Sequence, residues 1–125
     1  MKPPVDHIRI SSKGKETLIK LKKRTGIAHW NQLCRLALCR SLHLATKPTL
    51  PGPLDTAIEI DWKTFAGQYD SIFSALLLIR ASRDGVRVDS PEELTSYVRA
   101  HLERGISTLN SIKALGDVVV QQVRI

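Results

Sequence analysis

Alternating polar and apolar residues near the start of the chain predict a short strand that leads into a helix. The segment His7-Ile8-Arg9-Ile10-Ser11 places both isoleucines on the same face of a strand. Ser11 or Ser12 then supplies a hydroxyl that can cap the N-terminus of a helix, which we expect to continue to about Arg24. The start of the chain therefore predicts a strand followed directly by a helix.

The pattern that follows predicts two helices joined by a tight turn. A helix turns by about 100° per residue, so Leu18, Leu21 and Thr25 share one face of the first helix. Gly26 can take the left-handed conformation that ends a helix. A second helix is expected from residues 29–31 to about Leu44. We expect this helix to bury some of its mainly apolar residues Trp30, Leu33, Cys34, Ala37, Leu38 and Ser41.

Prolines interrupt this pattern in the middle of the chain. Residues 47–53 hold three prolines, which lack amide donors, and one glycine, and this composition excludes regular structure. The alternation in Ala57-Ile58-Glu59-Ile60-Asp61-Trp62 then predicts a brief strand. The mostly apolar stretch from residue 64 to about residue 83 predicts a largely buried helix. Within it, we expect Leu76 and Leu77 to belong to the core or to a subunit interface.

The segment Ser90-Pro91-Glu92-Glu93 gives the strongest local signal of a helix start. It combines an N-cap serine, a proline at the first helical position and a glutamate three residues after the cap. We expect this helix to reach about Ala114. The last residues, 117–125, form a tail with strand propensity.

These elements predict a single, mainly α domain over residues 1–125. It begins with a basic, ribbon-helix-helix-like strand-helix-helix unit (1–47), followed by a proline-rich connection and short extended segment (48–61). A helical part with two longer packed helices (62–116) and the tail (117–125) complete it. Hydrophobic residues make up 42% of the chain and aromatic residues only 5%, which favours an aliphatic core of packed helices.

The cysteines and the N-terminus indicate the compartment. Cys34 and Cys39 lie five residues apart and point in different directions on a helix, so we expect two buried thiols without a disulfide or metal site. The sequence has neither the apolar run of a secretory signal nor a stretch of roughly 20 apolar residues that could span a bilayer. We therefore expect a cytoplasmic protein.

Positive charge is concentrated in the first third of the chain. Residues 1–47 hold eleven of the nineteen Lys and Arg residues and only two acidic residues, a net +9, whereas residues 48–125 carry −2. Such a field suits a polyanion, and nucleic acid is the leading partner. Lysines on an exposed helix contact phosphates without reading base identity. The expected contacts to DNA are Lys13, Lys15, Lys20, Lys22, Lys23, Arg24, Arg35 and Arg40.

The sequence contains no recognised catalytic constellation or cofactor motif. Asp55, Glu59 and Asp61 lie within seven residues and are the best candidates for half of a magnesium site, with Asp70 as an isolated further candidate. We favour solvated charge for these acids, and a surface or helix-capping position for each of the four histidines. We therefore expect binding without a catalytic residue, metal ligand or cofactor.

Five segments within residues 7–112 form a further pattern: Ile8-Arg9-Ile10-Ser11, Leu21-Lys22-Lys23-Arg24-Thr25-Gly26-Ile27, Trp30-Asn31-Gln32-Leu33-Cys34-Arg35-Leu36-Ala37, Trp62-Lys63-Thr64-Phe65-Ala66-Gly67-Gln68-Tyr69 and His101-Leu102-Glu103-Arg104-Gly105-Ile106. Together they resemble the DndE family, the small component of the bacterial DNA phosphorothioation system. The resemblance implies a compact helical protein associated with the replacement of a non-bridging phosphate oxygen by sulfur. It also implies binding of nicked duplex DNA, assembly into oligomers, and sulfur chemistry by partners: a cysteine desulfurase, an iron-sulfur protein and an ATPase-like component.

The primary hypothesis is a DNA-binding accessory protein of DNA sulfur modification that contacts duplex or nicked DNA through its basic helical surface. Its expected partners are DNA, other phosphorothioation proteins and further copies of the chain, without a membrane. Two alternatives stay open. One is a metal-dependent nicking endonuclease that uses the acids named above. The other is a ribbon-helix-helix repressor in which His7, Arg9 and Ser11 of a dimer enter the major groove.

Overall fold

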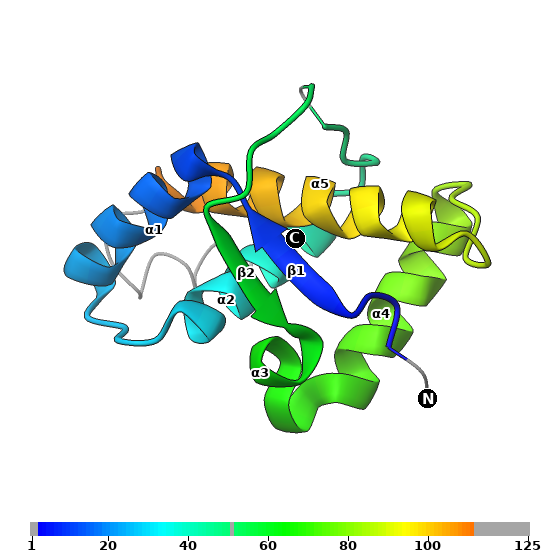
Figure 1. Ribbon diagram of the computed structural model, residues 1–125, viewed down its shortest axis with the longest axis horizontal. Helices are drawn as coiled ribbons and strands as arrows, with labels where there is room; N and C mark the ends of the chain where they lie inside the picture. The colour runs from blue at the N-terminus through cyan, green and yellow to red at the C-terminus, as the bar shows by residue number, and fades with distance from the viewer. Residues whose placement is uncertain (1–2, 51, 112–125) are drawn as a thin grey trace.

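The computed structural model describes residues 3–50 and 52–111, and this part of the chain is mainly helical with two short strands, as predicted (Figure 1). Helix α5 runs along one side of the molecule, the strands cross beside it, and α1 and α4 lie at opposite ends. None of the described helices is long and apolar enough to cross a membrane. In chain order the elements are β1 (His7–Ile10), α1 (Ser12–Thr25), α2 (Trp30–His43), β2 (Ile58–Asp61), α3 (Trp62–Ala66), the 3-10 turn η1 (Gly67–Tyr69), α4 (Asp70–Arg83) and α5 (Pro91–Leu109).

The two predicted strands pair with each other. They run antiparallel, with Ile8 opposite Ile60 and Ile10 opposite Ile58, and the two β1 isoleucines are buried. The strand-helix-helix order at the N-terminus is therefore present, and one edge of β1 is occupied by β2 of the same chain. In a ribbon-helix-helix dimer the strands of two copies pair instead. The ribbon-helix-helix character of the N-terminal unit therefore stays a prediction.

The most extensive packing between described elements is that of α2 against α5. A Cβ atom added at Gly105 would lie only 1.8 Å from the carbonyl oxygen of Ala37, so only glycine permits this approach of the two backbones. Leu33 and Leu38 of α2 and Leu102 of α5 are fully buried in the same cluster. The core is aliphatic around these two helices, as the composition predicts.

The prediction of one continuous helix over residues 64–83 is wrong. The structure has α3, η1 and α4 in its place, because Gly67 has φ 55° and ψ −133°, outside the helical region. Leu77 is buried, as expected of a core residue, whereas Leu76 is 44% exposed and lies outside the core; a subunit interface, the other expected place for it, stays a prediction. The local apolar pattern indicated a helix without showing which of its apolar residues face inward.

Helix α5 begins at Pro91 as predicted, with the Ser90 side chain accepting a hydrogen bond from the Glu93 amide. It ends at Leu109 instead of reaching Ala114. The carbonyl oxygen of Asn110, directly beyond the last turn, accepts a hydrogen bond of 2.7 Å from Arg24 and so is satisfied outside a helix. The tail expected over residues 117–125 lies outside the described residues.

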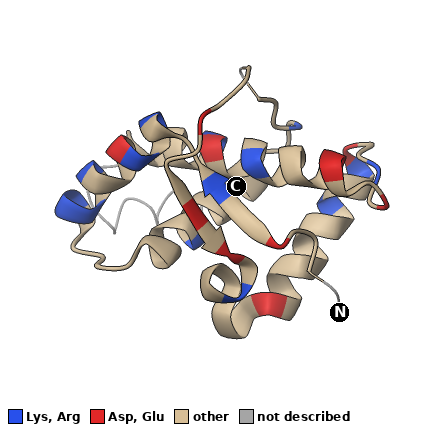
Figure 2. Cartoon of the chain, viewed as in Figure 1, with Lys and Arg blue, Asp and Glu red and all other residues tan. Residues whose placement is uncertain are grey.

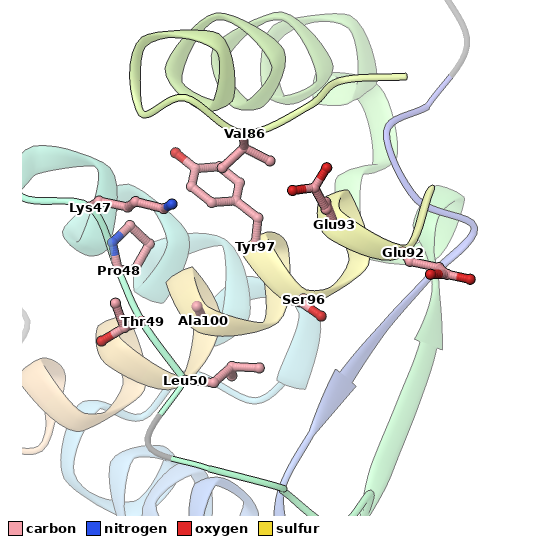
Figure 3. Close-up of a pocket in the computed structure, with 10 residues that line it drawn as sticks. All are labelled: Lys47, Pro48, Thr49, Leu50, Val86, Glu92, Glu93, Ser96, Tyr97 and Ala100. Atoms are coloured by element: carbon pink, nitrogen blue, oxygen red, sulfur yellow. The ribbon is translucent and has the colours of Figure 1, made fainter. Parts of the chain in front are cut away.

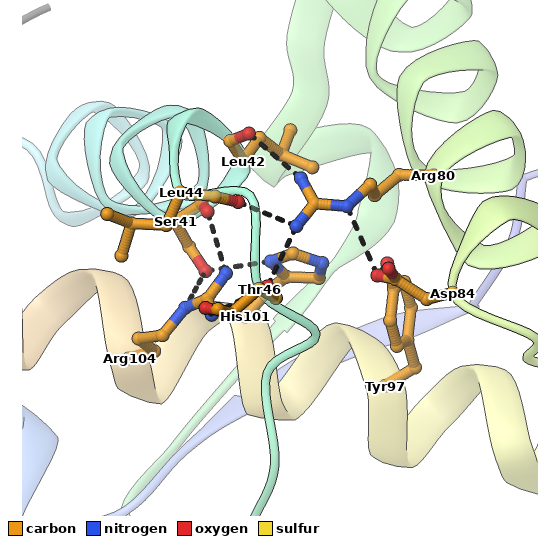
Figure 4. A network of polar contacts seen from close by, with 9 residues as sticks. All are labelled: Ser41, Leu42, Leu44, Thr46, Arg80, Asp84, Tyr97, His101 and Arg104. Carbon is orange, nitrogen blue, oxygen red and sulfur yellow. Dashed lines mark hydrogen bonds and ion pairs between the residues drawn. The ribbon is translucent and has the colours of Figure 1, made fainter.

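Two arginines attach the end of α2 and the start of the proline-rich connection to the rest of the fold (Figure 4). Arg80 donates to the carbonyl oxygens of Leu42, Leu44 and Thr46 at 2.9, 2.6 and 2.8 Å. Arg104 donates to the same Thr46 carbonyl at 2.9 Å. The chain is therefore fixed where it enters the connection.

Candidate nucleic-acid interface

The N-terminus of α1 is held in place by side chains from two distant segments. Ser11 caps the helix, since its Oγ accepts from the Gly14 amide at 3.0 Å. Glu103 of α5 accepts from the Ser11 hydroxyl at 2.6 Å and from the Ser11 amide at 3.1 Å. Asp55 accepts from the Ser12 amide at 3.0 Å and from its hydroxyl. These carboxylates complement the positive end of the helix dipole and anchor α1 to the body of the protein.

The two faces of α1 differ as the sequence predicts. Leu18 and Leu21 are buried in the core, whereas the outward side of the helix carries lysines. Figure 2 shows Lys and Arg positions repeated along α1, while acidic positions lie mostly on β2, α4 and around the start of α5. The predicted contact residues that are exposed on α1 are Lys13, Lys15, Lys20, Lys23 and Arg24.

Lys22 is the member of this set that packs against the protein. It is half-buried, and its Nζ lies 5.1 Å from the centroid of the Trp30 ring, a distance typical of a cation–π contact. Trp30 itself is partly buried against the core. This agrees with its interpretation as a packing residue of the second helix.

The two predicted contact residues on α2 are placed differently from the α1 lysines. Arg35 donates to the Phe65 carbonyl oxygen at 2.9 Å, and its guanidinium carbon lies 5.6 Å from the centroid of the Tyr69 ring. Arg40 is half-buried, and its Nε is buried without a hydrogen-bond partner. Arg35 therefore connects α2 to the segment around α3, and the structure does not bring the pair into the exposed α1 face.

Sequence reasoning missed Lys47 as a candidate contact. It is exposed, and together with Lys13 it lines a cavity of about 690 Å³ between the start of α1, the proline-rich connection and α5. Thr17 and Asn110 add polar groups to the same wall. Lys47 belongs to the charged first third of the chain. Because it lies outside a helix, the helical pattern could not show that it is close to α1.

A second cavity, of about 410 Å³, lies between the connection and the first half of α5 (Figure 3). Its wall combines Lys47 with apolar side chains such as Leu50 and Val86, and with Glu92 and Glu93. Ligand sites usually present a few polar groups that converge on one point. Here the two glutamates point in different directions, so their carboxylates do not converge on one point.

The three acids proposed as a magnesium half-site each have a structural partner. Asp55 caps α1 as described, and the hydrogen bonds from Ser12 hold its pKa below the ordinary value. Glu59 pairs with Arg9 across the two strands, with the Arg9 Nε 3.0 Å from the Glu59 carboxylate. Asp61 caps α3, and hydrogen bonds from Thr64 likewise lower its pKa.

The further acid, Asp70, accepts hydrogen bonds from the Trp62 indole at 2.5 Å and from the Ser74 hydroxyl at 3.2 Å. It therefore joins α4 to the start of α3. Within residues 3–50 and 52–111, no group of three or more His, Cys, Asp or Glu side chains is placed to hold a metal ion. In this region Asp55 and Asp61 cap helices, Glu59 forms an ion pair between the two strands, and Asp70 accepts hydrogen bonds within the helical part.

One histidine contradicts the expectation of a surface or capping position. His101 is fully buried, and its Nδ1 lies 2.7 Å from the Ser41 hydroxyl, which also accepts from the Arg104 Nε at 2.8 Å (Figure 4). Burial, helped by the charges of Arg104 and Arg80, lowers the pKa of His101 to about 4. The imidazole is therefore neutral near pH 7. Because Ser41 and His101 are both buried, neither side chain can reach a substrate.

The cysteine prediction is half wrong. Cys34 is buried, and burial raises the pKa of its thiol to about 12. Cys39 is exposed, because it lies on the side of α2 that faces away from α5 and the core. Burial around the thiol also raises the pKa of Cys39, which makes it a weakly reactive surface thiol.

The chain was compared with known proteins. Residues 7–116 match the family described as "DNA sulphur modification protein DndE". The crystal structure of DndE from Escherichia coli B7A, involved in DNA phosphorothioation modification, superimposes with a TM-score of 0.66 at 26% identity, over 83% of this chain and 94% of that one.

A mutant form of DndE, also described as involved in DNA phosphorothioation, gives a TM-score of 0.63 at 25% identity, over 83% of this chain and 95% of that one. A comparison with curated proteins found no match. The family match spans almost all of the described fold, from β1 through α5. The chain belongs to the DndE family of DNA sulphur modification proteins.

Proposed function

We propose that this protein is a DNA-binding accessory component of DNA phosphorothioation that contacts the backbone of duplex or nicked DNA through the exposed basic face of α1. The observation that carries the proposal is the row of solvent-exposed cations, from Lys13 to Arg24, on a helix anchored to the core. Lys47 extends the same surface beyond the helix.

The chemistry of this surface fits phosphate recognition. Lysine ammonium groups bind phosphates as mobile point charges, and each neutralised phosphate releases counterions, which supplies affinity independent of sequence. Contacts of this kind position a duplex and carry no base information. The protein would hold the DNA backbone while the sulfur-transferring proteins of the system modify it. The expected association with those proteins and the cytoplasmic location belong to the same proposal.

The two alternatives have less support from the arrangement of side chains. A ribbon-helix-helix repressor needs Arg9 free to enter a groove, but here Arg9 pairs with Glu59, and β1 already has a strand partner. A nicking endonuclease needs acids free to bind a metal, but Asp55 and Asp61 each cap a helix. These contacts therefore favour binding of the DNA backbone over both alternatives.

Fluorescence anisotropy with three DNA ligands of identical sequence tests the proposal: intact duplex, singly nicked duplex and single strand. We expect both duplexes to bind, the nicked one at least as tightly as the intact one, and the single strand to bind more weakly. Failure to bind either duplex at low salt would refute the proposal. Binding restricted to one sequence in the presence of competitor DNA would instead support the repressor.

A further inference from the structure

The cavity of about 690 Å³ at the start of α1 has the size and the charged groups of a ligand site. Sites for small ligands usually measure about 300–1,000 Å³. Lys13 and Lys47 reach the wall from two different segments, and both side chains are exposed. Neither ammonium group forms an ion pair with the described residues. The cavity therefore offers two cations to one anion.

The backbone that carries these two lysines is held by the rest of the fold. Lys13 lies in the first turn of α1, which hydrogen bonds to α5 anchor as described above. Lys47 directly follows Thr46, whose carbonyl oxygen accepts hydrogen bonds of 2.8 and 2.9 Å from Arg80 and Arg104. A site that is ordered in advance loses little conformational entropy when its ligand binds. The cavity is therefore prepared for an anion before one arrives.

The charge of the wall indicates which kind of anion fits. Lys13, Lys47 and Arg104 stand against the carboxylates of Asp55 and Glu103, which leaves one net positive charge. Hydrogen bonds from α1 lower the pKa of Asp55, so this carboxylate stays ionised near pH 7. A phosphodiester group carries a single negative charge, whereas a nucleoside triphosphate carries several. The wall therefore suits one phosphodiester of a nucleic-acid strand better than a free polyphosphate.

The uncharged part of the wall suits a nucleoside. Pro48, Leu54 and Ile106 form an apolar surface, and the exposed Ser107 and Asn110 add groups that donate and accept hydrogen bonds. Proteins that hold a base outside a duplex pack it against apolar or aromatic side chains and form hydrogen bonds to its edge. Two cations beside an apolar surface and neutral polar groups are the complement of one nucleotide.

The basic face of α1 leads to this cavity. At about 100° per residue, Lys13, Thr17, Lys20 and Arg24 fall within an arc of roughly 60°. The first two of them line the cavity. Arg24, at the other end of the helix, donates to the carbonyl oxygen of Asn110, a residue of the cavity wall. A DNA strand that follows this row along the helix therefore reaches the cavity.

We propose that the cavity holds one unpaired nucleotide of the bound DNA, with its phosphate at Lys13 and Lys47 and its base against Pro48, Leu54 and Ile106. The proposal rests on the proposed function, because α1 must first bind the DNA backbone. It adds a preference that phosphate contacts alone do not give. Opening an intact base pair costs free energy, so the site selects a nucleotide that already lacks a pairing partner.

Fluorescence anisotropy with the full chain and three duplexes of otherwise identical sequence tests this preference. One duplex is fully paired, one has a single unpaired thymidine, and one has an abasic residue at the unpaired position. The unpaired thymidine should raise affinity at least about fivefold over the paired duplex, the smallest gain usual for the stacking of one base. The abasic duplex should bind like the paired one, since it is equally flexible but has no base.

The possible results separate this proposal from the proposed function. Equal affinity for the three duplexes would overturn the nucleotide site and leave backbone binding intact. An equal gain for the abasic duplex would also overturn it, because the protein would then prefer flexible DNA. Failure of all three duplexes to bind would refute the proposed function, and the nucleotide site with it.

A substitution that fills the cavity locates the site. Ser107→Phe places a ring in the wall and should abolish the preference for the unpaired thymidine while the affinity for the paired duplex stays unchanged. Ser96→Phe is the matched control, because Ser96 is exposed on the same helix but lines the other cavity. This control should keep the preference. Circular dichroism establishes that both variants are folded.

Two lysine variants complete the test. Lys47→Gln lies outside the helices and should lower the affinity for the unpaired thymidine more than that for the paired duplex. Lys20→Ala, on the basic face but outside the cavity wall, should weaken all three duplexes alike. A preference that survives both Ser107→Phe and Lys47→Gln would place the nucleotide elsewhere and overturn the proposal.

Discussion

The Nζ of Lys22 lies over the ring of Trp30, 5.1 Å from its centroid, so one lysine of the basic face also packs on α2. Replacing it with methionine should lower both DNA affinity and the free energy of unfolding, the latter by about 0.5–1 kcal/mol, the worth of an exposed cation–π contact. Lys22→Arg should retain both properties. Urea unfolding and anisotropy measure the two effects, and Lys20→Met is the control that should change only affinity.

The exposed lysines of α1 should contribute to DNA binding through counterion release. If about five phosphates are neutralised, the logarithm of affinity should fall with the logarithm of salt at a slope near −4 to −5, and a slope shallower than about −2 would contradict the proposed interface. Lys20→Ala and Lys23→Ala should each reduce the steepness by about one, for every DNA sequence alike. Lys63→Ala, an exposed position on α3, should leave the slope unchanged.

The contact between α2 and α5 predicts a severe effect for a small substitution. Gly105→Ala forces a methyl group to within 1.8 Å of the Ala37 carbonyl oxygen, and backbone cannot yield as a flexible side chain does. We expect a loss of at least about 3 kcal/mol of unfolding free energy, the upper range for overpacked cores. Ser107→Ala, on the exposed side of α5, should cost less than about 0.5 kcal/mol. Thermal or urea unfolding compares the two variants.

His101 should make the fold sensitive to mild acid. Its pKa is about 4 in the folded protein and returns to about 6.5 on unfolding, so the unfolded chain binds more protons between these values. Stability is therefore fully retained above about pH 6.5 and falls as the pH is lowered toward 4. Urea midpoints at pH 7.5, 6 and 5 measure the decline.

The control for this pH dependence is His101→Asn, which removes the titrating group and keeps a polar side chain beside Ser41. Its urea midpoint should vary much less between pH 7.5 and 5. The lowered pKa values of Asp55 and Asp61 affect stability only at more acidic pH. An equal decline in both proteins would show that another group is responsible.

The candidate acids are engaged in helix caps and in an ion pair within the fold. The protein should therefore bind plasmid DNA without cutting it. Supercoiled plasmid incubated with the pure protein and magnesium or manganese should stay supercoiled on an agarose gel. The decisive variant is Glu59→Ala, since Glu59 pairs only with an exposed Arg9 and its loss should not unfold the protein. Metal-dependent nicking that disappears in this variant would establish the endonuclease.

Much of the fold could be predicted because its signals are local. Ser11 and Ser90 cap helices where hydroxyls precede apolar periodicity, and Gly26 ends α1 with φ 76°. The alternation of isoleucines likewise identified both strands. Each of these features depends on neighbours within a few residues, which the sequence displays directly.

The sequence could not show contacts between distant segments. Local periodicity marked Leu76 and Leu77 as equally apolar, and only the position of α4 against the rest of the core decides that Leu77 faces inward. His101 is buried because Ser41, sixty positions earlier, supplies its hydrogen bond. For the candidate interface, charge density predicted DNA contacts by the α1 lysines, which stay a prediction, while the attachment of Arg35 to the Phe65 carbonyl could not be inferred from its charge.

The anchoring of α1 by Glu103 and Asp55 has a calorimetric consequence. A basic segment that orders only on contact with DNA buries apolar surface as it folds, and its binding enthalpy then changes steeply with temperature. Here the helix is already formed, and Lys13, Lys15, Lys20 and Lys23 are exposed on it. Titration calorimetry should therefore find an enthalpy of DNA association that is nearly constant between about 10 and 35 °C, the signature of a surface that docks without folding.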